Sequence, residues 1–193
     1  MKYKVGMYGG SFNPLHLGHV NNIITASNLC EKLYVVLSVT NDENEIDHRE
    51  RFMWLKNITS EMENVEVFEI FDKNTSKDTY DWETGANEIK KYINKPIDVV
   101  FSGDDYQGKD RWEKLYPESE IYYIPRSNIN ISSTEIRKNP YKYFDYLPNC
   151  VKPYYTKKVC IIGTESTGKS CSNRPQLRPV DRHHRAHLHR VRR

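Results

Sequence analysis

Two histidines stand three residues apart at the start of a predicted helix, shortly after a pair of glycines. They are His16 and His19, and the glycines are Gly9 and Gly10, directly after a predicted strand. Imidazoles at this spacing lie on one face of a helix, and the N–H groups of a helix N-terminus attract anions. Adjacent glycines let a ligand approach the backbone closely. The segment therefore predicts a phosphate site, with a capped helix and a packed ring as the plainer interpretation; a zinc site would need a third ligand, and none stands at a suitable spacing.

A second candidate phosphate site lies at residues 131–137, which read Ile-Ser-Ser-Thr-Glu-Ile-Arg. Ser132 and Glu135 have the spacing of a capping box, so we expect a helix to begin here. The hydroxyls of its first turn and the guanidinium of Arg137 are suitable partners for phosphate oxygens. A helix that is only well capped is the alternative interpretation.

A third motif has the pattern of a phosphate-binding P-loop and follows a predicted strand at residues 159–162. Its fixed positions are Gly163, Gly168, Lys169 and Ser170. Only 23 residues follow Ser170, and they supply neither a second strand nor the acid that usually supports Mg²⁺. We therefore expect residues 157–170 to be the start of a P-loop kinase domain that is cut short and does not function. Residues 171–193 form an Arg/His-rich tail that we expect not to fold.

Strand-length apolar runs alternate with helix-like segments along the chain. The runs lie at residues 4–8, 33–39, 65–71, 97–101, 120–124 and 159–162, and the helical segments at 17–30, 47–58, 82–93, 109–115 and 133–138. This order predicts an α/β fold, a Rossmann-like doubly wound parallel sheet with a short P-loop remnant at the C-terminus. Ligands of such sheets bind at the carboxyl ends of the strands. We assign residues 1–156 to this first domain, including an aromatic connector at 139–156.

The charge of the chain is unevenly distributed. The formal net charge is +3, but residues 171–193 hold seven arginines and one acid, which leaves 22 basic and 25 acidic residues in the rest. The body is thus slightly acidic, which argues against nucleic acid as a partner. No apolar run is long enough to span a membrane and no secretory signal is present, so we expect a cytoplasmic protein. The four cysteines form no C-x-x-C pair, so neither a zinc site nor a disulfide framework is indicated.

The two phosphate motifs together resemble the signatures of the nucleotidyltransferase superfamily, H-x-G-H and I-S-S-T-x-x-R. With the P-loop and the connector, the order of motifs resembles the bifunctional nicotinamide-mononucleotide adenylyltransferase / ribosylnicotinamide kinase (NadR-type) family over residues 3–170. The resemblance implies transfer of AMP from ATP to nicotinamide mononucleotide (NMN), giving NAD and pyrophosphate. It implies that His16, His19 and Arg137 are catalytic, that Mg²⁺ arrives on the ATP phosphates, and that the protein itself ligates no metal.

The same resemblance implies a set of binding residues. Those for substrate and nucleotide are Gly9, Gly10, Ser11, Phe12, Asn13, Arg51, Tyr80, Asp81, Trp82, Phe101, Ser102, Gly103, Asp104, Asn130, Ile131, Ser132, Ser133 and Thr134. Trp82 would stack on the pyridinium ring, or else be a core aromatic. Asp104 would meet the adenosine, or else serve as a turn or cap. Arg51 is the nearest base to an unexpectedly acidic loop at residues 41–45, where a phosphate contact is expected.

Three alternative functions remain open at this point. A related transferase would use another phosphate acceptor, such as nicotinate mononucleotide or pantetheine phosphate, or would use CTP. An inactive sensor would bind NAD or ATP without turnover. A ribosylnicotinamide kinase is disfavoured because so little of the kinase domain is present.

Overall fold

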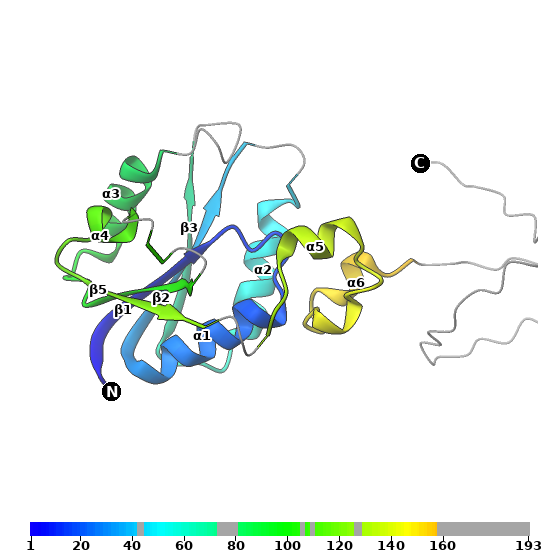
Figure 1. The fold of residues 1–193 in the computed structure, drawn as a ribbon, viewed down its shortest axis with the longest axis horizontal. Coiled ribbons are helices and arrows are strands. Elements are labelled where there is room, and N and C mark those ends of the chain that lie inside the picture. Colours follow the sequence, from blue (N-terminus) through cyan, green and yellow to red (C-terminus); the bar gives the residue numbers. More distant parts are fainter. Residues whose placement is uncertain (42–44, 73–80, 105–106, 109–110, 126–128, 158–193) are drawn as a thin grey trace, which may run out of the picture. The chain divides into compact units, whose positions relative to one another are not determined.

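Five parallel strands form a single sheet in the order β3-β2-β1-β4-β5 (Figure 1). The computed structural model describes residues 1–41, 45–72, 81–104, 107–108, 111–125 and 129–157. The strands are β1 (Tyr3–Gly10), β2 (Cys30–Val39), β3 (Val65–Phe71), β4 (Val99–Gly103) and β5 (Glu120–Ile124). The predicted doubly wound parallel sheet is confirmed.

Strand β1 occupies the centre of the sheet. The chain proceeds from β1 through β2 to the edge strand β3, and then returns to β4 and β5 on the other side of β1. The direction of winding therefore reverses between β1 and β4, which pair with Tyr8 opposite Phe101. Crevices at the carboxyl ends of the strands beside such a reversal are where α/β sheets bind ligands.

Helices cover both faces of the sheet. They are α1 (Leu17–Leu29), α2 (His48–Ile58), α3 (Trp82–Ile93), α4 (Arg111–Leu115), α5 (Ser133–Lys138), the 3₁₀ helix η4 (Phe144–Tyr146) and α6 (Lys152–Tyr155). One buried cluster joins strand side chains to Ile23 of α1, Leu55 of α2 and Ile136 of α5. A second cluster on the opposite face contains Ile89 of α3 and Trp112 of α4. The β-branched strands are apolar on both faces because both faces are covered.

The aromatic connector packs onto the same core as α1 and α2. Leu147 and Val151 are almost completely buried within that cluster, and the ring of Tyr154 meets that of Trp54 edge to face at 5.6 Å. The chain divides into two compact units, Met1–Thr156 and Lys157–Arg193. Several predicted features lie outside the described residues. These are the sixth strand expected at residues 159–162, the P-loop positions Gly163, Gly168, Lys169 and Ser170, the tail at 171–193, and Tyr80.

No helix within the described residues is long and apolar enough to cross a membrane. Within the same residues, no group of three or more His, Cys, Asp or Glu side chains is placed to hold a metal ion.

Candidate active site

A pocket of about 540 Å³ opens where β1, β2 and β4 end. This volume is in the range typical of small-molecule sites. Nine of the predicted site residues line it: Gly9, Gly10, Ser11, His16, His19, Trp82, Ser102, Gly103 and Ile131. The structure therefore gathers residues from four separate segments of the sequence around one cavity, at the reversal of the sheet.

The two histidines lie at the start of α1 and stack on each other. Their ring centroids are 3.7 Å apart with 22° between the planes, and His16 is the N-cap residue of α1. The glycine between them has a steric reason, because a Cβ on Gly18 would lie 3.0 Å from the His16 ring. An imidazole pair at a helix N-terminus on a pocket wall is well suited to oppose phosphate charge.

The loop before these histidines has residues on the pocket wall and residues behind it. Phe12 adopts a positive φ of 46° and is almost fully buried, with its ring edge-to-face against Tyr8 and, at 5.0 Å, against His19. Asn13 is also buried, and its Oδ1 accepts a hydrogen bond from the Ile46 N–H at 3.2 Å. Phe12 and Asn13 therefore shape the loop, whereas Ser11 lines the cavity.

The second motif is tied directly to this loop. Ser132 and Glu135 form the predicted capping box at the start of α5. The Ser133 hydroxyl donates to the Pro14 carbonyl at 3.0 Å, and the Arg137 guanidinium donates to the Asn13 carbonyl. Two motifs that are more than a hundred residues apart in sequence thus share hydrogen bonds in the structure.

Most polar residues of the second motif lie beside the pocket. Of its predicted site residues, only Ile131 lines the cavity; Asn130, Thr134 and Arg137 are exposed, and Ser132 and Ser133 are half-buried. Arg137 also donates to the Thr134 hydroxyl at 3.3 Å. Their contacts with phosphate stay predictions, and they would require a ligand that extends from the pocket toward α5.

An aromatic wall closes the side of the pocket formed by α3 and α4. The rings of Trp82 and Trp112 meet edge to face at 5.6 Å, and the Trp112 indole N–H donates to the buried Ser102 hydroxyl at 2.9 Å. The Arg111 guanidinium lies over the Trp82 ring at 4.2 Å. Among the described lining residues, Arg111 is the one Lys, Arg, Asp or Glu side chain. Arg111 and Trp112 were not predicted as site residues from the sequence, although they are the first two residues of α4, the helix that follows β4.

Three other predicted residues have structural positions outside the cavity wall. Asp81 caps α3, and hydrogen bonds from the Thr84 N–H and hydroxyl hold the pKa of its carboxyl below the usual value. Phe101 belongs to β4 and is buried in the core, with its ring against that of Tyr122. Asp104 follows β4 and is half-buried, but is not a lining residue.

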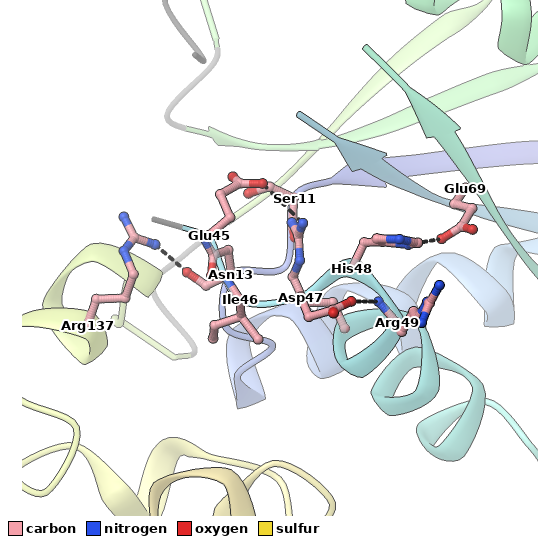
Figure 2. A network of polar contacts seen from close by, with 10 residues as sticks. Ser11, Asn13, Glu45, Ile46, Asp47, His48, Arg49, Glu69 and Arg137 are labelled. Carbon is pink, nitrogen blue, oxygen red and sulfur yellow. Dashed lines mark hydrogen bonds and ion pairs between the residues drawn. The ribbon is translucent and has the colours of Figure 1, made fainter. Parts of the chain in front are cut away.

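Arg51 is buried behind the pocket rather than exposed in it. Its side chain is 1% exposed, pairs with Glu45 at 3.0 Å and donates to the Ser11 carbonyl at 2.8 Å (Figure 2). Burial lowers the pKa of the guanidinium, and the charge of Glu45 opposes that shift. Arg51 thus has protein partners in this structure, and the direct phosphate contact expected from the sequence stays a prediction.

The fold is the Rossmann-like α/β fold of nucleotidyltransferases. Residues 7–139 match the cytidylyltransferase-like family, and the chain belongs to this family. It is therefore a nucleotidyltransferase, and the resemblance to the NadR-type domain inferred from its motifs is confirmed.

Several relatives are adenylyltransferases. The chain is 26% identical over 183 residues to the trifunctional NAD biosynthesis/regulator protein NadR of Escherichia coli, covering 88% of this chain and 45% of that protein. It therefore spans about half the length of the NadR proteins it matches. It is 32% identical to phosphopantetheine adenylyltransferase of Mycoplasma mycoides, covering 70% of this chain and 95% of the relative. It is 30% identical to a probable nicotinate-nucleotide adenylyltransferase of Thermotoga petrophila, with coverage of 70% and 84%.

Solved structures share the fold. A NadR protein in complex with NR aligns with a TM-score of 0.67 at 23% identity, over 86% of this chain and 49% of that one. A NadR protein in complex with NAD and AMP-PNP aligns with a TM-score of 0.65, also at 23% identity, over 86% and 50%.

Proposed function

We propose that this protein transfers AMP from ATP to NMN, giving NAD and pyrophosphate. The observation that carries the proposal is the stacked pair His16 and His19 on the wall of a pocket whose opposite side holds Trp82 and Trp112. Imidazoles at a helix N-terminus suit phosphates, and an indole face suits a pyridinium ring. A dinucleotide product needs both kinds of surface in one cavity.

The chemistry requires no general base. The second pKa of a phosphate monoester is about 6, so the acceptor is largely ionised at neutral pH. A phosphate oxygen of NMN attacks the α-phosphorus of ATP, a new P–O bond forms, and the bond to the β-phosphate oxygen breaks with its electron pair leaving on pyrophosphate. The protein must then align the reactants and stabilise the developing charge.

We assign that stabilisation to the histidines and Arg137. His16 and His19 lie on the pocket wall. Arg137 lies beside the loop that precedes them and donates a hydrogen bond to the Asn13 carbonyl of that loop. Mg²⁺ bound to the ATP phosphates would supply further charge neutralisation. The described lining residues include no carboxylate, so ATP oxygens and water are the ligands that fit this ion here.

Nicotinate mononucleotide is the second candidate acceptor, and Arg111 favours it. A guanidinium over the Trp82 ring would repel a pyridinium that carries no acidic group, and would pair with a nicotinate carboxylate. The relatives include proteins named for nicotinate nucleotide as well as for NAD biosynthesis.

We further propose that residues 1–156 hold the transferase and that residues 157–170 begin a separate P-loop domain. The described residues of the first unit contain the five-stranded sheet and all the residues that line the pocket. This assignment gives ribosylnicotinamide phosphorylation no part in the reaction proposed here.

The test is an assay of product formation from ATP with NMN, nicotinate mononucleotide and phosphopantetheine as separate acceptors. Release of pyrophosphate is the readout. We expect transfer to a pyridine mononucleotide. His19→Ala should lower kcat by about 10²- to 10³-fold, the scale of losing one preorganised donor. Binding of NAD without release of pyrophosphate from ATP in the presence of any of these acceptors would instead establish a sensor, and an unchanged kcat in His19→Ala would remove the role assigned to this residue.

A further inference from the structure

Arg51 and Glu45 form an ion pair behind the pocket wall, and the reaction scheme assigns neither a role. Their side chains are 1% and 5% exposed, and the guanidinium Nη2 lies 3.0 Å from the Glu45 carboxylate. The other terminal nitrogen, Nη1, donates to the Ser11 carbonyl at 2.8 Å. We propose that the Arg51–Glu45 pair is a positioning device that fixes the loop of residues 9–14, and so sets the rate of nucleotidyl transfer. This inference rests on the proposed function.

Apolar side chains at these two positions would stabilise the fold at least as well as the ion pair. Two charges removed from water are costly, and a buried ion pair stabilises a fold no better than apolar side chains of the same volume. One terminal nitrogen of the guanidinium pairs with Glu45, and the other donates a hydrogen bond to a backbone carbonyl of the pocket loop. Ser11 and Glu45, the two partners of this guanidinium, lie close together in Figure 2.

The carbonyl that Arg51 holds belongs to the peptide before the most unusual residue of the loop. A trans peptide directs its N–H opposite to its C=O, so anchoring the Ser11 carbonyl also fixes the direction of the Phe12 N–H. Phe12 itself has a φ of 46°, a region that residues other than glycine seldom adopt unless their surroundings hold them there.

The next residue of the loop is held from the same side. The Ile46 N–H, adjacent to Glu45, donates to Asn13 Oδ1 at 3.2 Å. From the α5 side, Arg137 and Ser133 hold the carbonyls of Asn13 and Pro14. The loop is therefore clamped between the segment after β2 and the second motif, and Arg51 is the charged side chain of the clamp that is almost fully buried.

The clamp matters for chemistry because the loop sets the position of the histidines. The Phe12 ring contacts His19 edge to face at 5.0 Å, and His19 stacks on His16 at 3.7 Å. A change in the Ser11–Phe12 peptide is thus passed through the Phe12 ring to both imidazoles. Misplacing a reacting group by even about 1 Å costs on the order of 10²-fold in rate.

The test compares Arg51→Lys, Glu45→Gln and the double variant with the wild-type full chain. Arg49→Lys is the matched control, because it makes the same substitution on the exposed face at the start of α2. The measurements are kcat and KM for ATP, the melting temperature, and amide hydrogen exchange of peptides covering residues 9–16 in the absence of ligand. The exchange measurement needs no turnover, so it distinguishes failure of this inference from failure of the proposed function.

We expect both single variants to lower kcat by about 10- to 100-fold with KM for ATP changed by less than about threefold. Exchange in residues 9–16 should accelerate by about tenfold in both, and the double variant should be no worse than the worse single variant. Arg49→Lys should match the wild type. Unchanged exchange in both folded variants would overturn the inference. So would a raised KM in Arg51→Lys beside a normal Glu45→Gln, which is the signature of a direct phosphate contact; if Arg51→Lys does not fold, Glu45→Gln decides by the same two measurements.

Discussion

The glycine of the H-x-G-H motif permits a test that separates stability from activity. Gly18 lies in the first turn of α1, and a Cβ placed there would lie 3.0 Å from both Cε1 and Nδ1 of the His16 ring and 3.6 Å from the Ile129 carbonyl. Contacts between such atoms are normally about 3.5–4.0 Å, so Gly18→Ala requires the ring to move by several tenths of an ångström. His16 is buried and stacked on His19, so the movement displaces the pair.

The effect on stability should be small because two terms oppose each other. Alanine is favoured over glycine in a helix by about 1 kcal/mol, and overpacking a buried site typically costs about 1–3 kcal/mol. The net loss is therefore within about 2 kcal/mol, and the melting temperature of a domain this size falls by no more than about 8 °C. The effect on rate should be much larger, a fall in kcat of about 10²-fold, because both imidazoles are misplaced.

Calorimetric melting and pyrophosphate release measure the two quantities on the same preparation. If displacement of His16 is the cause, adding Gly18→Ala to His16→Ala should cost no further activity, since the ring it would push is gone. A folded Gly18→Ala protein with wild-type kcat would refute the reasoning, as would fully additive losses in the double variant.

Three further predictions concern charge and burial. Arg111→Gln should lower the ratio of kcat/KM for nicotinate mononucleotide to that for NMN by about five- to tenfold, since the charged partner of the carboxylate over Trp82 is lost; an unchanged ratio would remove Arg111 from acceptor selection. The pKa of Asp81 is lower in the folded than in the unfolded protein, so the ionised carboxylate stabilises the fold above the unfolded pKa, and this contribution disappears as the pH falls through the folded pKa. The difference in melting temperature between the wild type and Asp81→Asn should therefore shrink between about pH 6 and about pH 3. A difference that stays constant over this range would contradict the assignment. Burial, with a smaller contribution from a nearby carboxylate, raises the pKa of Cys30 to about 12, so iodoacetamide at about pH 8 should leave this thiol unmodified until the protein is unfolded, as peptide mass mapping would show.

The sheet and its winding were predictable because the apolar runs are short, β-branched and separated by helical segments. The strand bounds were less so: β1 continues through Gly9 and Gly10, which were expected to lie beyond a strand ending at Tyr8, because the pairing with β2 extends to Gly10. Hydrogen bonding to a neighbour decides where a strand ends, and a single sequence does not show which strand that neighbour is.

The site was predictable where a motif names the residue, and less so where packing decides which side chains reach the cavity. The spacing of His16 and His19 at a helix start indicated a phosphate site, and their assignment as catalytic residues came from the resemblance to the H-x-G-H signature. Arg111 and Trp112 were missed because they line the pocket only through the way α4 packs beside α3, with the Trp112 indole anchored on Ser102. Arg51 was identified, but its charge was interpreted as free to meet phosphate because the sequence does not show that Glu45 would be buried beside it.

The segments of the site therefore combine two kinds of residue that a motif does not distinguish. Ser11 and His19 face the cavity, whereas the side-chain oxygen and the carbonyl of Asn13 accept hydrogen bonds from Ile46 and Arg137. Residues such as Asn13 determine where the residues that face the cavity lie. Burying their polar groups costs free energy, and hydrogen bonds to protein partners offset that cost. The acidic side chain of Glu45 after β2 is accordingly no obstacle to a phosphate site, since it pairs with Arg51 and does not line the pocket that a nucleotide would contact.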